Sequence, residues 1–537
     1  MGLVGWQCGT DIVRLASHQD NILILDFGSQ YTQLLARRVR EANVYSSILP
    51  FNASMAQIRH LRPKGLILSG GPASSYLLGA PKASQKLFSL GIPILGICYG
   101  MQVIAQTKGG KVSRTAKREY GPATLKFDDT SDLFHQIGKK NMGTPVWMSH
   151  GDRIDRLPSG FTSIAHTANA PIAAMRDKTR QVFGLQFHPE VVHTPKGTQI
   201  IRNFVHRVCG CLETWNTTSW IDPMVATVQK QAPSGHIICA LSGGVDSTVA
   251  ASLTHRAVGN RLTCIFVNNG LLRANEAQAV LASLRTHLKL NLRYVDASAQ
   301  FLRALKNVEN PERKRKIIGR EFIRVFEAEA KLINAQSKES PVTYLVQGTL
   351  YPDVVESGAT LGPSAIIKTH HNVGGLPARM KLKVIEPLRD LFKDEVRRLG
   401  TELGLPDTMI WRQPFPGPGL AIRIIGPVTR PSLKILREAD VIVEEEVCPA
   451  GLGRKVWQAF AVLIPVRTVG IRGDKRSYEH VIAIRAVQSD DGMTADWVRL
   501  PHDLLGRIAH RITNEVNGVN RVVYDLSTKP PSTIEWE

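Results

Sequence analysis

Short apolar runs that end in a turn recur along the first two hundred residues of the chain. Stretches with helical apolar spacing lie between these runs, which occupy residues 21–28, 65–72, 92–98 and 182–187. Strands that alternate with helices indicate a mostly parallel sheet with helices on its faces. Sites in such sheets form at the carboxyl ends of the strands. The pattern predicts an α/β domain at residues 21–210, preceded by an extension of residues 1–20.

A polar connection follows, and the alternation of strands and helices then resumes. A short helix is predicted at 220–230, and a longer helix is predicted to begin at residue 249. The predicted strands and their turns occupy residues 235–241, 261–270 and 344–353. A second α/β domain is therefore expected at residues 211–412.

The segment from Pro414 to Gly419, which reads Pro-Phe-Pro-Gly-Pro-Gly, is a rigid boundary. One amphipathic helix is predicted after it, at 501–516, together with strands at 420–425, 459–468, 480–487 and 521–525. This is a small α+β unit at residues 413–537. Such a unit can barely bury both faces of a sheet, so we expect it to pair with a second copy as a homodimer.

Composition narrows the class of protein. A chain of 537 residues is too long for one core, and no apolar run is long enough to span a bilayer. The seven cysteines lack paired spacing, which favours a cytoplasmic protein over a disulfide framework. The charge of +21 suggests nucleic acid, but the basic residues are dispersed and no aromatic-interleaved patch occurs. We therefore expect anionic small molecules, and neither nucleic acid nor a membrane, as the main partners.

Cys98 lies between Gly96 and Gly100, directly after a predicted strand. A Gly-x-Cys-x-Gly turn is the thiol counterpart of the nucleophile elbow. The glycines permit a tight turn that exposes the sulfur, and the N-terminus of the next helix favours the reactive thiolate. A lone cysteine after an apolar strand is more often inert. The flanking glycines, and the distant histidine described next, favour a nucleophile here.

His188 and Glu190 belong to a His-Pro-Glu sequence that follows another predicted strand. An imidazole there can take the thiol proton and return it to departing ammonia. Glu190 can accept the other ring N–H and fix the tautomer. The Gly70-Gly71 turn can offer N–H groups to the oxyanion of a tetrahedral intermediate, although it can also be a simple turn.

These residues resemble the class I (triad) glutamine amidotransferases over about residues 20–209. The likeness extends to the Asp26-Phe27-Gly28-Ser29-Gln30 and Ser149-His150-Gly151-Asp152 segments. It implies a triad of Cys98, His188 and Glu190 that hydrolyses glutamine through a glutamyl thioester. It also implies a glutamine and oxyanion site formed by Gly71, Tyr99 and Gln102.

A second motif, at residues 242–247, reads Ser242-Gly243-Gly244-Val245-Asp246-Ser247 and follows a predicted strand. Two glycines let backbone N–H groups approach an anion, and the helix N-terminus and the serine hydroxyls add to the cradle. Asp246 is a candidate ligand for a Mg²⁺ that accompanies the bound phosphates. A Gly/Ser turn with a helix cap is the plainer interpretation, but it explains all six residues poorly.

The motif has no Gly-Lys-Ser/Thr ending and is therefore not an ordinary P-loop. It resembles instead that of the ATP pyrophosphatases, with an adenine-nucleotide α-hydrolase-like fold, which split ATP between the α and β phosphates. This family usually has an acidic residue where Asn268 stands. The resemblance therefore leaves open any role of a carboxylate at that position.

Lys368, His370 and His371 lie in a loop flanked by glycines. Cationic donors on a mobile loop suit a lid that closes over phosphates and excludes water from a reactive adenylate. Paired histidines also suggest a metal, but adjacent residues on an extended loop point apart. Asp353 and Glu356 are three residues apart, so they share a face if that stretch is helical.

The ordered pieces, with the tail from Lys529 to Glu537, resemble the family of glutamine-hydrolysing GMP synthetases over roughly residues 20–537. The resemblance implies that XMP, ATP, glutamine and water give GMP, AMP, pyrophosphate and glutamate, through adenylation of the xanthine 2-oxygen. It implies Mg²⁺ with ATP and no organic prosthetic group. By matching positions, the lid contains Asp353, Glu356, Lys368, His370 and His371, with Lys393 and Asp394 linked to it. The XMP pocket contains Arg315, Gln458, Lys529, Ile534 and Glu535.

Three other interpretations are weaker. Glutamine-dependent NAD synthetases pair the nucleotide fold with a nitrilase-like glutaminase, which the Cys98 set argues against. A tRNA-sulfur-transfer enzyme would explain the charge, but it needs paired cysteines and an RNA-binding module, and neither is evident. A binding-only relative does not need Cys98, His188, Asp246 and Lys368, all of which are intact.

Overall fold

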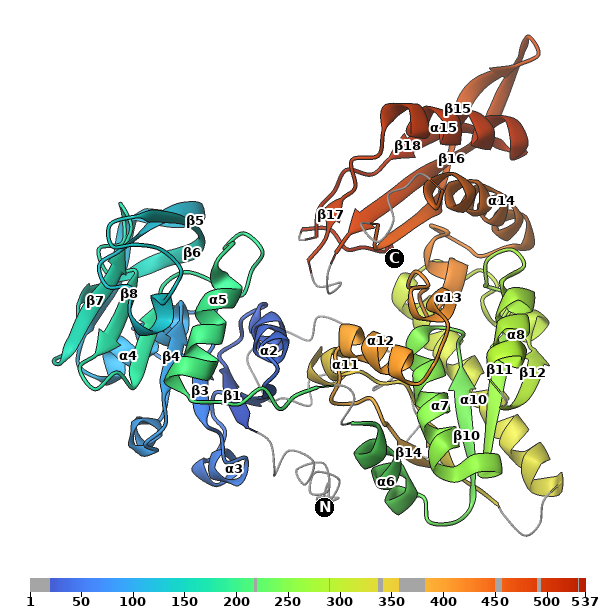
Figure 1. The fold of residues 1–537 in the computed structure, drawn as a ribbon. Coiled ribbons are helices and arrows are strands. Elements are labelled where there is room, and N and C mark those ends of the chain that lie inside the picture. The colour runs from blue at the N-terminus through green and yellow to red at the C-terminus, as the bar shows by residue number, and fades with distance from the viewer. Residues whose placement is uncertain are drawn as a thin grey trace. The chain divides into compact units, whose positions relative to one another are not determined.

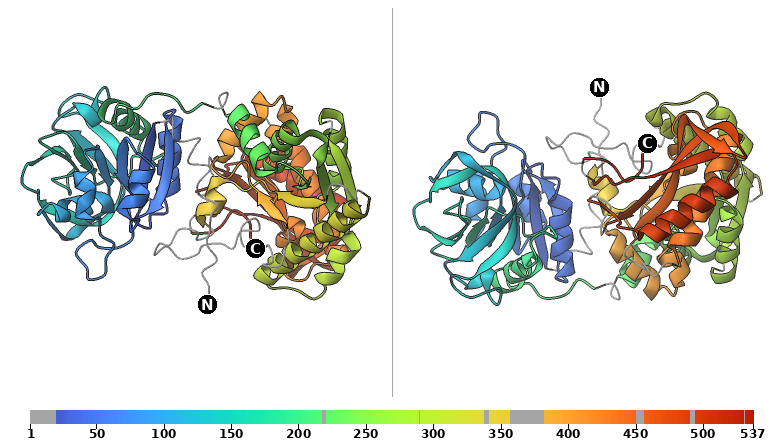
Figure 2. Two further views of the ribbon diagram at one scale, coloured as in Figure 1. Left: turned by 90° about the horizontal axis from the view of Figure 1, so that it is seen from below. Right: turned by 90° about the horizontal axis from the view of Figure 1, so that it is seen from above.

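The computed structural model describes residues 20–216, 220–288, 290–336, 341–356, 382–449, 456–489, 494–529 and 531–537. The chain divides into two compact units, one built mainly from residues before 220 and the other mainly from residues after it. Figure 1 labels the elements of each unit, and Figure 2 gives two further views. Among the described residues, no helix combines the length and the apolar character that crossing a bilayer needs.

The first unit is built on a nine-stranded sheet in the order β2-β1-β3-β4-β9-β8-β7-β5-β6. Its parallel half contains β1 (Asn21–Asp26), β2 (Tyr45–Pro50), β3 (Gly65–Leu68), β4 (Ile94–Ile97) and β9 (Val182–Leu185). Its antiparallel half contains β5 (Lys111–Phe127), β6 (Gly143–Arg156), β7 (Phe161–His166) and β8 (Ala174–Asp177). The sequence predicted the parallel strands β1, β3, β4 and β9, whereas β2 and the antiparallel half had not been predicted.

Helices flank the parallel half of this sheet. They are α2 (Thr32–Glu41), α3 (Met55–His60), α4 (Tyr99–Thr107) and α5 (Gly197–Arg202), and α5 continues into a π-helical turn at Asn203–Val208. Leu23 of β1, Leu66 of β3 and Ile104 of α4 belong to one buried apolar cluster. Alternate residues of a strand share a face, so this cluster packs α4 onto the ends of β1 and β3.

A second, entirely parallel sheet forms part of the second unit, in the order β12-β11-β10-β13-β14. The strands are β10 (His236–Leu241), β11 (Leu262–Asn268), β12 (Asn291–Asp296), β13 (Val342–Val346) and β14 (Lys383–Ile385). The helices are α6 (Ile221–Gln231), α7 (Val245–Val258), α8 (Glu276–His287), α9 (Ser298–Ala304), α10 (Pro311–Gln336), α11 (Tyr351–Glu356), α12 (Lys393–Glu402) and α13 (Asp407–Ile410).

Helix α7 begins four residues earlier than predicted, at Val245 rather than at residue 249. The Gly244 carbonyl accepts hydrogen bonds from the Thr248 backbone N–H, at 3.1 Å, and from the Thr248 hydroxyl, at 2.9 Å. These bonds start the helix within the motif itself. The residues at 245–247 therefore form the first helical turn, where backbone N–H groups are free for an anion.

The third predicted part carries a sheet of β15 (Gln458–Arg472), β16 (Lys475–Gln488), β17 (Asp496–Trp497) and β18 (Val519–Tyr524). Helix α15 (His502–Glu515) is the predicted amphipathic helix, but a second helix, α14 (Arg430–Val447), had been missed. Its sequence signal is the capping box of Thr429 and Ser432 with a proline in the first turn. Figure 1 shows α14 and α15 beside this sheet.

The predicted strand at 420–425 is wrong. Residues Gly419–Ile422 form a 3₁₀ turn, and only Ile424 makes an isolated bridge, with Leu463. Gly419 has φ of 63° and its backbone packs against the Leu271 carbonyl, which ends any extended conformation there. The run is apolar because it is buried between the two sheets, and periodicity alone does not distinguish such a segment from a buried strand.

The two sheets of the second unit share one hydrophobic core. A single buried cluster joins Ile238 of β10 and Ile265 of β11 to Leu436 of α14, Ile482 of β16 and Ile508 of α15. The boundary expected near residue 412 therefore separates two sheets but not two independent cores.

Among the described residues of this unit, three cations are completely buried, and each contacts the last residues of the chain. Lys314 donates to the Ala421 carbonyl at 3.1 Å and to the Ile424 carbonyl at 2.7 Å, and it forms an ion pair with Glu537. Arg423 pairs with Glu535, and Arg485 donates to the Ser527 and Thr533 carbonyls. Lys314 therefore does not lie on a solvated face of α10. Burial lowers the pKa of Lys314, and Glu537 raises it in part.

We predict that Lys314→Met destabilises the second unit, because it leaves the Glu537 carboxylate buried without its cation. The free energy of unfolding is expected to fall by about 3–5 kcal/mol, as measured by chemical denaturation. Lys434→Met is the control, since that lysine is 76% exposed and lies 3.9 Å from Glu438. It is expected to cost less than about 0.5 kcal/mol. Equal losses in the two variants would contradict a structural role for Lys314.

Candidate functional site

Cys98 occupies the turn between β4 and α4 in a strained backbone conformation. Its φ is 50° and its ψ is −105°, and it is the N-cap residue of α4. Such a conformation costs a non-glycine residue on the order of 1–3 kcal/mol and is concentrated at functional sites. The thiol lies at the positive end of the α4 dipole. Cys98 is only 6% exposed, so little of this residue faces solvent.

The two glycines beside Cys98 act through close packing, while the cysteine itself adopts the positive φ. A Cβ at Gly100 would lie 2.2 Å from the Leu68 carbonyl oxygen, and one at Gly96 would lie 2.6 Å from the Gly100 backbone. No side chain fits in either position. The glycines therefore let α4 begin directly against the end of β3, which brings Cys98 to the edge where the Gly70-Gly71 turn lies.

His188 and Glu190 form the predicted pair beside this thiol. The His188 Nδ1 and Glu190 Oε1 atoms are 2.8 Å apart, and both residues are buried. Burial lowers the pKa of His188, but the Glu190 carboxylate and the hydrogen bond to Cys98 together raise it well above its ordinary value. The imidazole therefore holds its proton readily. This is the electrostatic arrangement that stabilises a cysteine thiolate and prepares a general acid.

The segment around His188 is fixed by backbone contacts. The His188 N–H donates to the Trp147 carbonyl at 3.0 Å, and the Thr194 hydroxyl donates to the His188 carbonyl at 2.7 Å. The Tyr31 ring lies edge-on to the imidazole with ring centroids 5.2 Å apart. These contacts leave the Nε2 side of the ring available for the thiol, because Nδ1 is used by Glu190.

The three residues expected at the oxyanion and glutamine site lie close to the triad, but they do so in different ways. A Cβ at Gly71 would lie 2.7 Å from the Phe27 carbonyl oxygen, so this turn also tolerates only glycine. The Tyr99 side chain points away, since its hydroxyl donates to the Pro81 carbonyl at 2.6 Å and burial raises its pKa to about 12. Tyr99 can therefore contribute only its backbone N–H. Gln102 is buried and donates to the Asp152 carbonyl at 3.2 Å.

Gln186 is a site residue that the sequence analysis missed. Its amide nitrogen lies 3.7 Å from the Cys98 sulfur, and its amide oxygen accepts from Gln102 at 3.3 Å. It is completely buried. The available signal was its place two residues before His188, at the end of the same predicted strand. Gln186 therefore links Gln102 to the thiol.

A buried polar network supports the site from the antiparallel half of the sheet, and it had also not been predicted. The His150 Nε2 and Glu119 Oε2 atoms are 3.1 Å apart, and Thr167 donates to Glu119 at 2.9 Å. His150 Nδ1 lies 2.9 Å from the Asp152 carbonyl. Burial lowers the pKa of His150, although Glu119 raises it in part. The pairing of β5 with β6 places Glu119 opposite His150.

The loop of residues 242–247, which we call the phosphate loop after its expected role, lies in the second unit between β10 and α7. Its two serines hold each other, since the Ser242 and Ser247 hydroxyl oxygens are 3.0 Å apart and the Ser242 N–H donates to Ser247 Oγ at 3.2 Å. The Gly244 N–H donates weakly to Ser242 Oγ at 3.3 Å. Gly243 has φ of 77°, a conformation that favours glycine. The loop is thus already shaped around an anion site at the start of α7.

Asp246 projects from the first turn of α7 toward Lys393 of α12. The Lys393 nitrogen lies 3.4 Å from Asp246 Oδ2, and Asp246 Oδ1 is buried with no hydrogen-bond partner among the described residues. A buried carboxylate oxygen without a donor fits a hard cation such as Mg²⁺. No group of three potential metal-ligating side chains occurs within the described residues, so the phosphates would have to supply further ligands. A Cβ at Gly348 would touch the Asp246 backbone at 3.0 Å, which places the loop after β13 here as well.

The expected lid lies largely outside the described residues. Lys368, His370 and His371 fall in the segment 357–381, and the structure does not describe the Glu356 side chain. Asp353 lies in α11, as the helical spacing suggested, and its carboxylate accepts from the Leu350 N–H at 2.9 Å. Asp394 follows Lys393 in the first turn of α12 and pairs with Arg398 at 2.8 Å.

Most of the residues expected to bind XMP meet at the end of the chain. Arg423 holds the Glu535 carboxylate with two bonds of 3.1 and 3.0 Å, and Gln458 donates to Glu535 Oε1 at 2.9 Å. Ile534 packs against the small apolar cluster of Phe460, Val462 and Ala483. Arg315 donates to the Glu537 carbonyl. Arg423 had not been predicted as a site residue.

Lys529 and Asn268 hold turns beside these sites. Lys529 forms a two-way backbone bridge with Ala495, with hydrogen bonds of 3.0 and 2.8 Å. Asn268, where the related family usually has an acid, accepts from the Gly270 N–H at 3.0 Å and donates to the Tyr294 hydroxyl at 3.3 Å. Its amide therefore fixes the turn after β11.

Three family models match consecutive parts of the chain. Residues 23–208 match the family described as glutamine amidotransferase class-I, residues 232–418 match thiamine biosynthesis protein (ThiI), and residues 445–536 match GMP synthase C terminal domain. Enzymes named GMP synthase [glutamine-hydrolyzing] resemble nearly the whole chain. Those of Brucella ovis, Nitratidesulfovibrio vulgaris and Brachyspira hyodysenteriae are 56%, 55% and 54% identical, over 97%, 97% and 96% of this chain and 99% of each relative.

We predict that Glu190→Gln lowers the pKa of His188, because it removes the negative charge that opposes burial. Glutamine hydrolysis should then fall by about 10²- to 10⁴-fold, measured as glutamate release, and the pKa change should be visible in an NMR titration of the imidazole. Since the wild-type pKa is raised, the charged pair stabilises the fold fully below the ordinary histidine pKa. This contribution is lost as the pH rises through the raised value.

The matched control is Glu213→Gln. Glu213 is also a glutamate beside a histidine, 3.8 Å from His206 Nε2, but its side chain is 50% exposed. Glutamine hydrolysis should be unchanged in this variant. A Glu190→Gln protein with normal activity and an unchanged His188 titration would rule out the orienting role.

Proposed function

The chain belongs to the glutamine-hydrolysing GMP synthases, and from this premise we propose how its own residues divide the reaction. The enzyme is a ligase that makes GMP from XMP with nitrogen from glutamine. Cleavage of ATP to AMP and pyrophosphate drives the replacement of an oxygen by an amine. The overall products are GMP, AMP, pyrophosphate and glutamate. The observation that carries the assignment is the buried His188–Glu190 pair beside the Cys98 thiol, on the same chain as a loop shaped for phosphate.

The first half of the reaction takes place at Cys98. The sulfur attacks the carboxamide carbon of glutamine, and the N–H groups of Gly71 and Tyr99 receive the oxyanion. His188 gives its proton to the departing ammonia, which leaves a glutamyl thioester. It then takes a proton from the water that hydrolyses this thioester to glutamate. The raised pKa of His188 supports this role, because the acid form is available when ammonia leaves.

The second half takes place at residues 242–247. The xanthine 2-oxygen of XMP attacks the α-phosphorus of ATP, and pyrophosphate leaves toward the N-terminus of α7. The backbone N–H groups of Gly243, Gly244 and Val245 and the hydroxyls of Ser242 and Ser247 retain it there. Ammonia then adds to C2 of the purine and AMP departs. The pre-shaped hydroxyl contact between Ser242 and Ser247 supports this assignment.

Asp246 is the residue that we propose to hold Mg²⁺. Its unpartnered buried oxygen supports this, and Lys393 balances the other oxygen at 3.4 Å. When bound, the ion neutralises the charge that develops on the pyrophosphate. Lys393 lies beside the Asp246 carboxylate of the loop, so its ammonium group can also reach the phosphates.

The XMP pocket is proposed at the tail, with Arg315, Gln458, Lys529, Ile534 and Glu535. Arg423 holds Glu535 with two bonds, which orients its carboxylate before any ligand arrives. Glu535 can still accept from sugar hydroxyls or from a base N–H through its remaining lone pairs. Arg315 and Lys529 are cations suited to the phosphate of XMP.

We further propose that the loop with Lys368, His370 and His371 closes over the adenylate together with Asp353, Glu356 and Asp394. Lys368 would neutralise the α-phosphate as pyrophosphate leaves. Exclusion of water matters here, because the adenylate would otherwise hydrolyse. The position of Asp353 and Asp394 in the first turns of α11 and α12, beside Lys393, supports this grouping.

We propose a cytoplasmic homodimer that pairs through the sheet of β15 and β16. These strands are joined by a two-residue turn in which Gly473 and Asp474 both have positive φ, of 52° and 61°. Val469, Ile471 and Tyr478 lie on one face of this hairpin and are 41%, 80% and 59% exposed. Exposed apolar residues on a strand pair favour association with a second copy. The six cysteines within the described residues are all free, which supports a reducing compartment.

The first prediction here concerns the nitrogen source. Cys98→Ala should abolish GMP formation from glutamine and leave GMP formation from ammonium within about twofold of wild type, because the second half of the reaction does not use the thiol. The assay follows GMP, AMP and pyrophosphate from XMP and ATP with each nitrogen source. Loss of both activities in a folded protein would contradict two separate sites.

The second prediction concerns the dimer. Ile471→Lys should shift the protein toward the monomer in sedimentation velocity, because it places a charge in the proposed apolar contact. Leu78→Lys is the matched control, since Leu78 is a fully exposed apolar residue of the other unit. It should leave the sedimentation coefficient unchanged. Identical behaviour of wild type and Ile471→Lys would remove the hairpin from the interface.

A further inference from the structure

The orientation of one peptide group decides how the phosphate loop presents its N–H groups. The Gly243 carbonyl and the Gly244 N–H belong to the same trans peptide, so they point in opposite directions. Glycine at 243, with φ of 77°, can turn this peptide over at little cost. Whatever holds the Gly243 carbonyl therefore also sets the direction of the Gly244 N–H.

Arg412 holds that carbonyl from outside the loop. Its Nη1 donates to the Gly243 oxygen at 2.9 Å, and its Nη2 forms an ion pair with Glu276. Arg412 lies after α13, far along the chain from the loop. Since the carbonyl is tied to Arg412, the Gly244 N–H is directed to the opposite side, toward Ser242 Oγ and the anion site.

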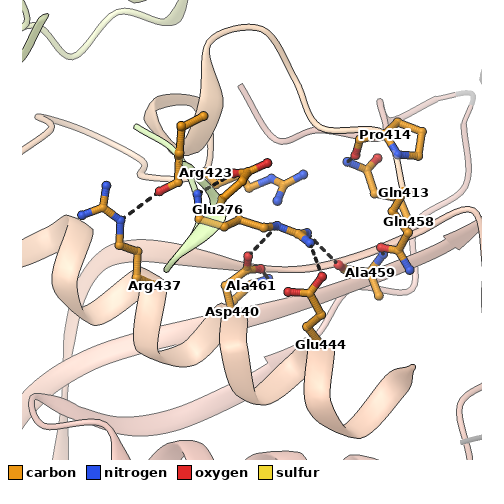
Figure 3. Close-up of polar contacts among 12 residues, drawn as sticks. Glu276, Gln413, Pro414, Arg423, Arg437, Asp440, Glu444, Gln458, Ala459 and Ala461 are labelled. Carbon is orange, nitrogen blue, oxygen red and sulfur yellow. Dashed lines mark hydrogen bonds and ion pairs between the residues drawn. The ribbon is translucent and has the colours of Figure 1, made fainter. Parts of the chain in front are cut away.

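Glu276 and Arg273 stand behind Arg412. Glu276 is 6% exposed, and its second oxygen accepts from the Arg273 N–H at 2.8 Å. The Arg273 side chain extends to Asp440 and Glu444 of α14, which Figure 3 labels, with ion pairs of 2.9 Å each. Burial lowers the pKa of Arg273, but Asp440, Glu444 and Glu276 together raise it above its ordinary value. Arg273 therefore stays charged. We call Arg412, Glu276 and Arg273 the loop clamp.

The same region contacts the tail segment where XMP is proposed to bind. Gln413 accepts from the Ala459 N–H at 3.1 Å, and the Pro414 carbonyl accepts from Gln458 at 3.0 Å. Gln458 in turn donates to Glu535 at 2.9 Å. Figure 3 shows Gln413, Pro414, Gln458 and Ala459 together beside α14. The consecutive residues 412–414 thus contact the phosphate loop at one end and the tail contacts at the other.

We propose that Arg412 is a positioning residue for adenylation. It sets the direction of the Gly243–Gly244 peptide, and with Glu276 and Arg273 it fixes the phosphate loop to the α14 and β15 segment that carries the XMP-binding tail. The inference rests on the proposed role of residues 242–247 in holding pyrophosphate. It assigns to Arg412 no contact with substrate.

The surroundings make the inference testable by mild substitutions. A cavity of about 680 Å³ borders the clamp and is lined in part by Val280, Trp411, Phe415 and Trp457. A smaller side chain at position 412 can therefore be accommodated without rearranging the residues around it. Lysine retains the charge at this position, but it does not have the guanidinium fork that bonds Gly243 and Glu276 at the same time.

The experiment measures Arg412→Lys and Glu276→Gln in the full-length enzyme with ATP, XMP and ammonium. In Arg412→Lys, the KM for ATP and the inhibition constant of inorganic pyrophosphate with Mg²⁺ should both rise by about tenfold, because charged hydrogen bonds are lost behind the loop. Glutamine hydrolysis and the melting temperature should change little. Glu276→Gln should have a smaller effect in the same direction. The double variant should be no worse than Arg412→Lys, since both act through one contact.

Arg511→Lys is the matched control, because Arg511 also bridges carboxylates, at Glu445, Glu446 and Glu515, without contacting the phosphate loop. It should leave the inhibition by pyrophosphate unchanged. A merely structural role for Arg412 would lower the melting temperature and leave the pyrophosphate constant within twofold of wild type, which would overturn the inference. If Arg412→Lys does not fold, the inhibition constant of pyrophosphate in Glu276→Gln tests the proposal instead. Failure of the wild type to form AMP and pyrophosphate from ATP and XMP would instead refute the proposed function.

Discussion

Both reaction centres depend on a backbone that passes from a buried parallel strand directly into a helix N-terminus with no room for a side chain. Next to Cys98, a Cβ added at Gly96 or Gly100 would lie only 2.2–2.6 Å from neighbouring backbone atoms. At residues 242–247, Gly243 takes the positive φ and the helix begins within the motif. In each case the free N–H groups of the first turn provide a positive field at a fixed position. In the proposed function, this arrangement stabilises a thiolate in one unit and binds a phosphate in the other.

Carboxylates in both units raise the pKa of buried basic groups, so that these groups keep their charge. Glu190 raises the pKa of His188 against the effect of burial, and Asp440 and Glu444 do the same for Arg273. A buried base that keeps its proton is suited to release ammonia. A buried arginine that keeps its charge is suited to hold a loop. The loop clamp is proposed to act in a similar way. The charge of Arg412 directs the Gly244 N–H toward the anion site without contacting substrate itself.

The strong positive charge of the chain has a partial structural explanation. Several buried or half-buried cations donate to backbone carbonyls, in addition to the carboxylates that pair with Lys314 and Arg485. Lys314 donates to two carbonyls, Arg485 to at least two, and Arg437 to those of Gly270 and Leu272. A cation held by carbonyl dipoles needs no matching acid in the sequence. Part of the charge of +21 therefore lies inside the second unit. It tethers the tail there and does not form a surface for nucleic acid.

The sequence by itself determined the two chemistries, because each depends on residues that are adjacent in the chain. Gly-x-Cys-x-Gly, His-Pro-Glu and the run at 242–247 each follow an apolar strand, and parallel strands bring such ends to one edge of a sheet. The tertiary structure decided everything that joins distant segments. The contacts of Gln186 with Cys98, of Glu119 with His150, of Lys314 with Glu537 and of Arg412 with Gly243 span 88, 31, 223 and 169 residues. The run at 420–425 was mistaken for a strand for the same reason, since an apolar run shows that a segment is buried but not against what.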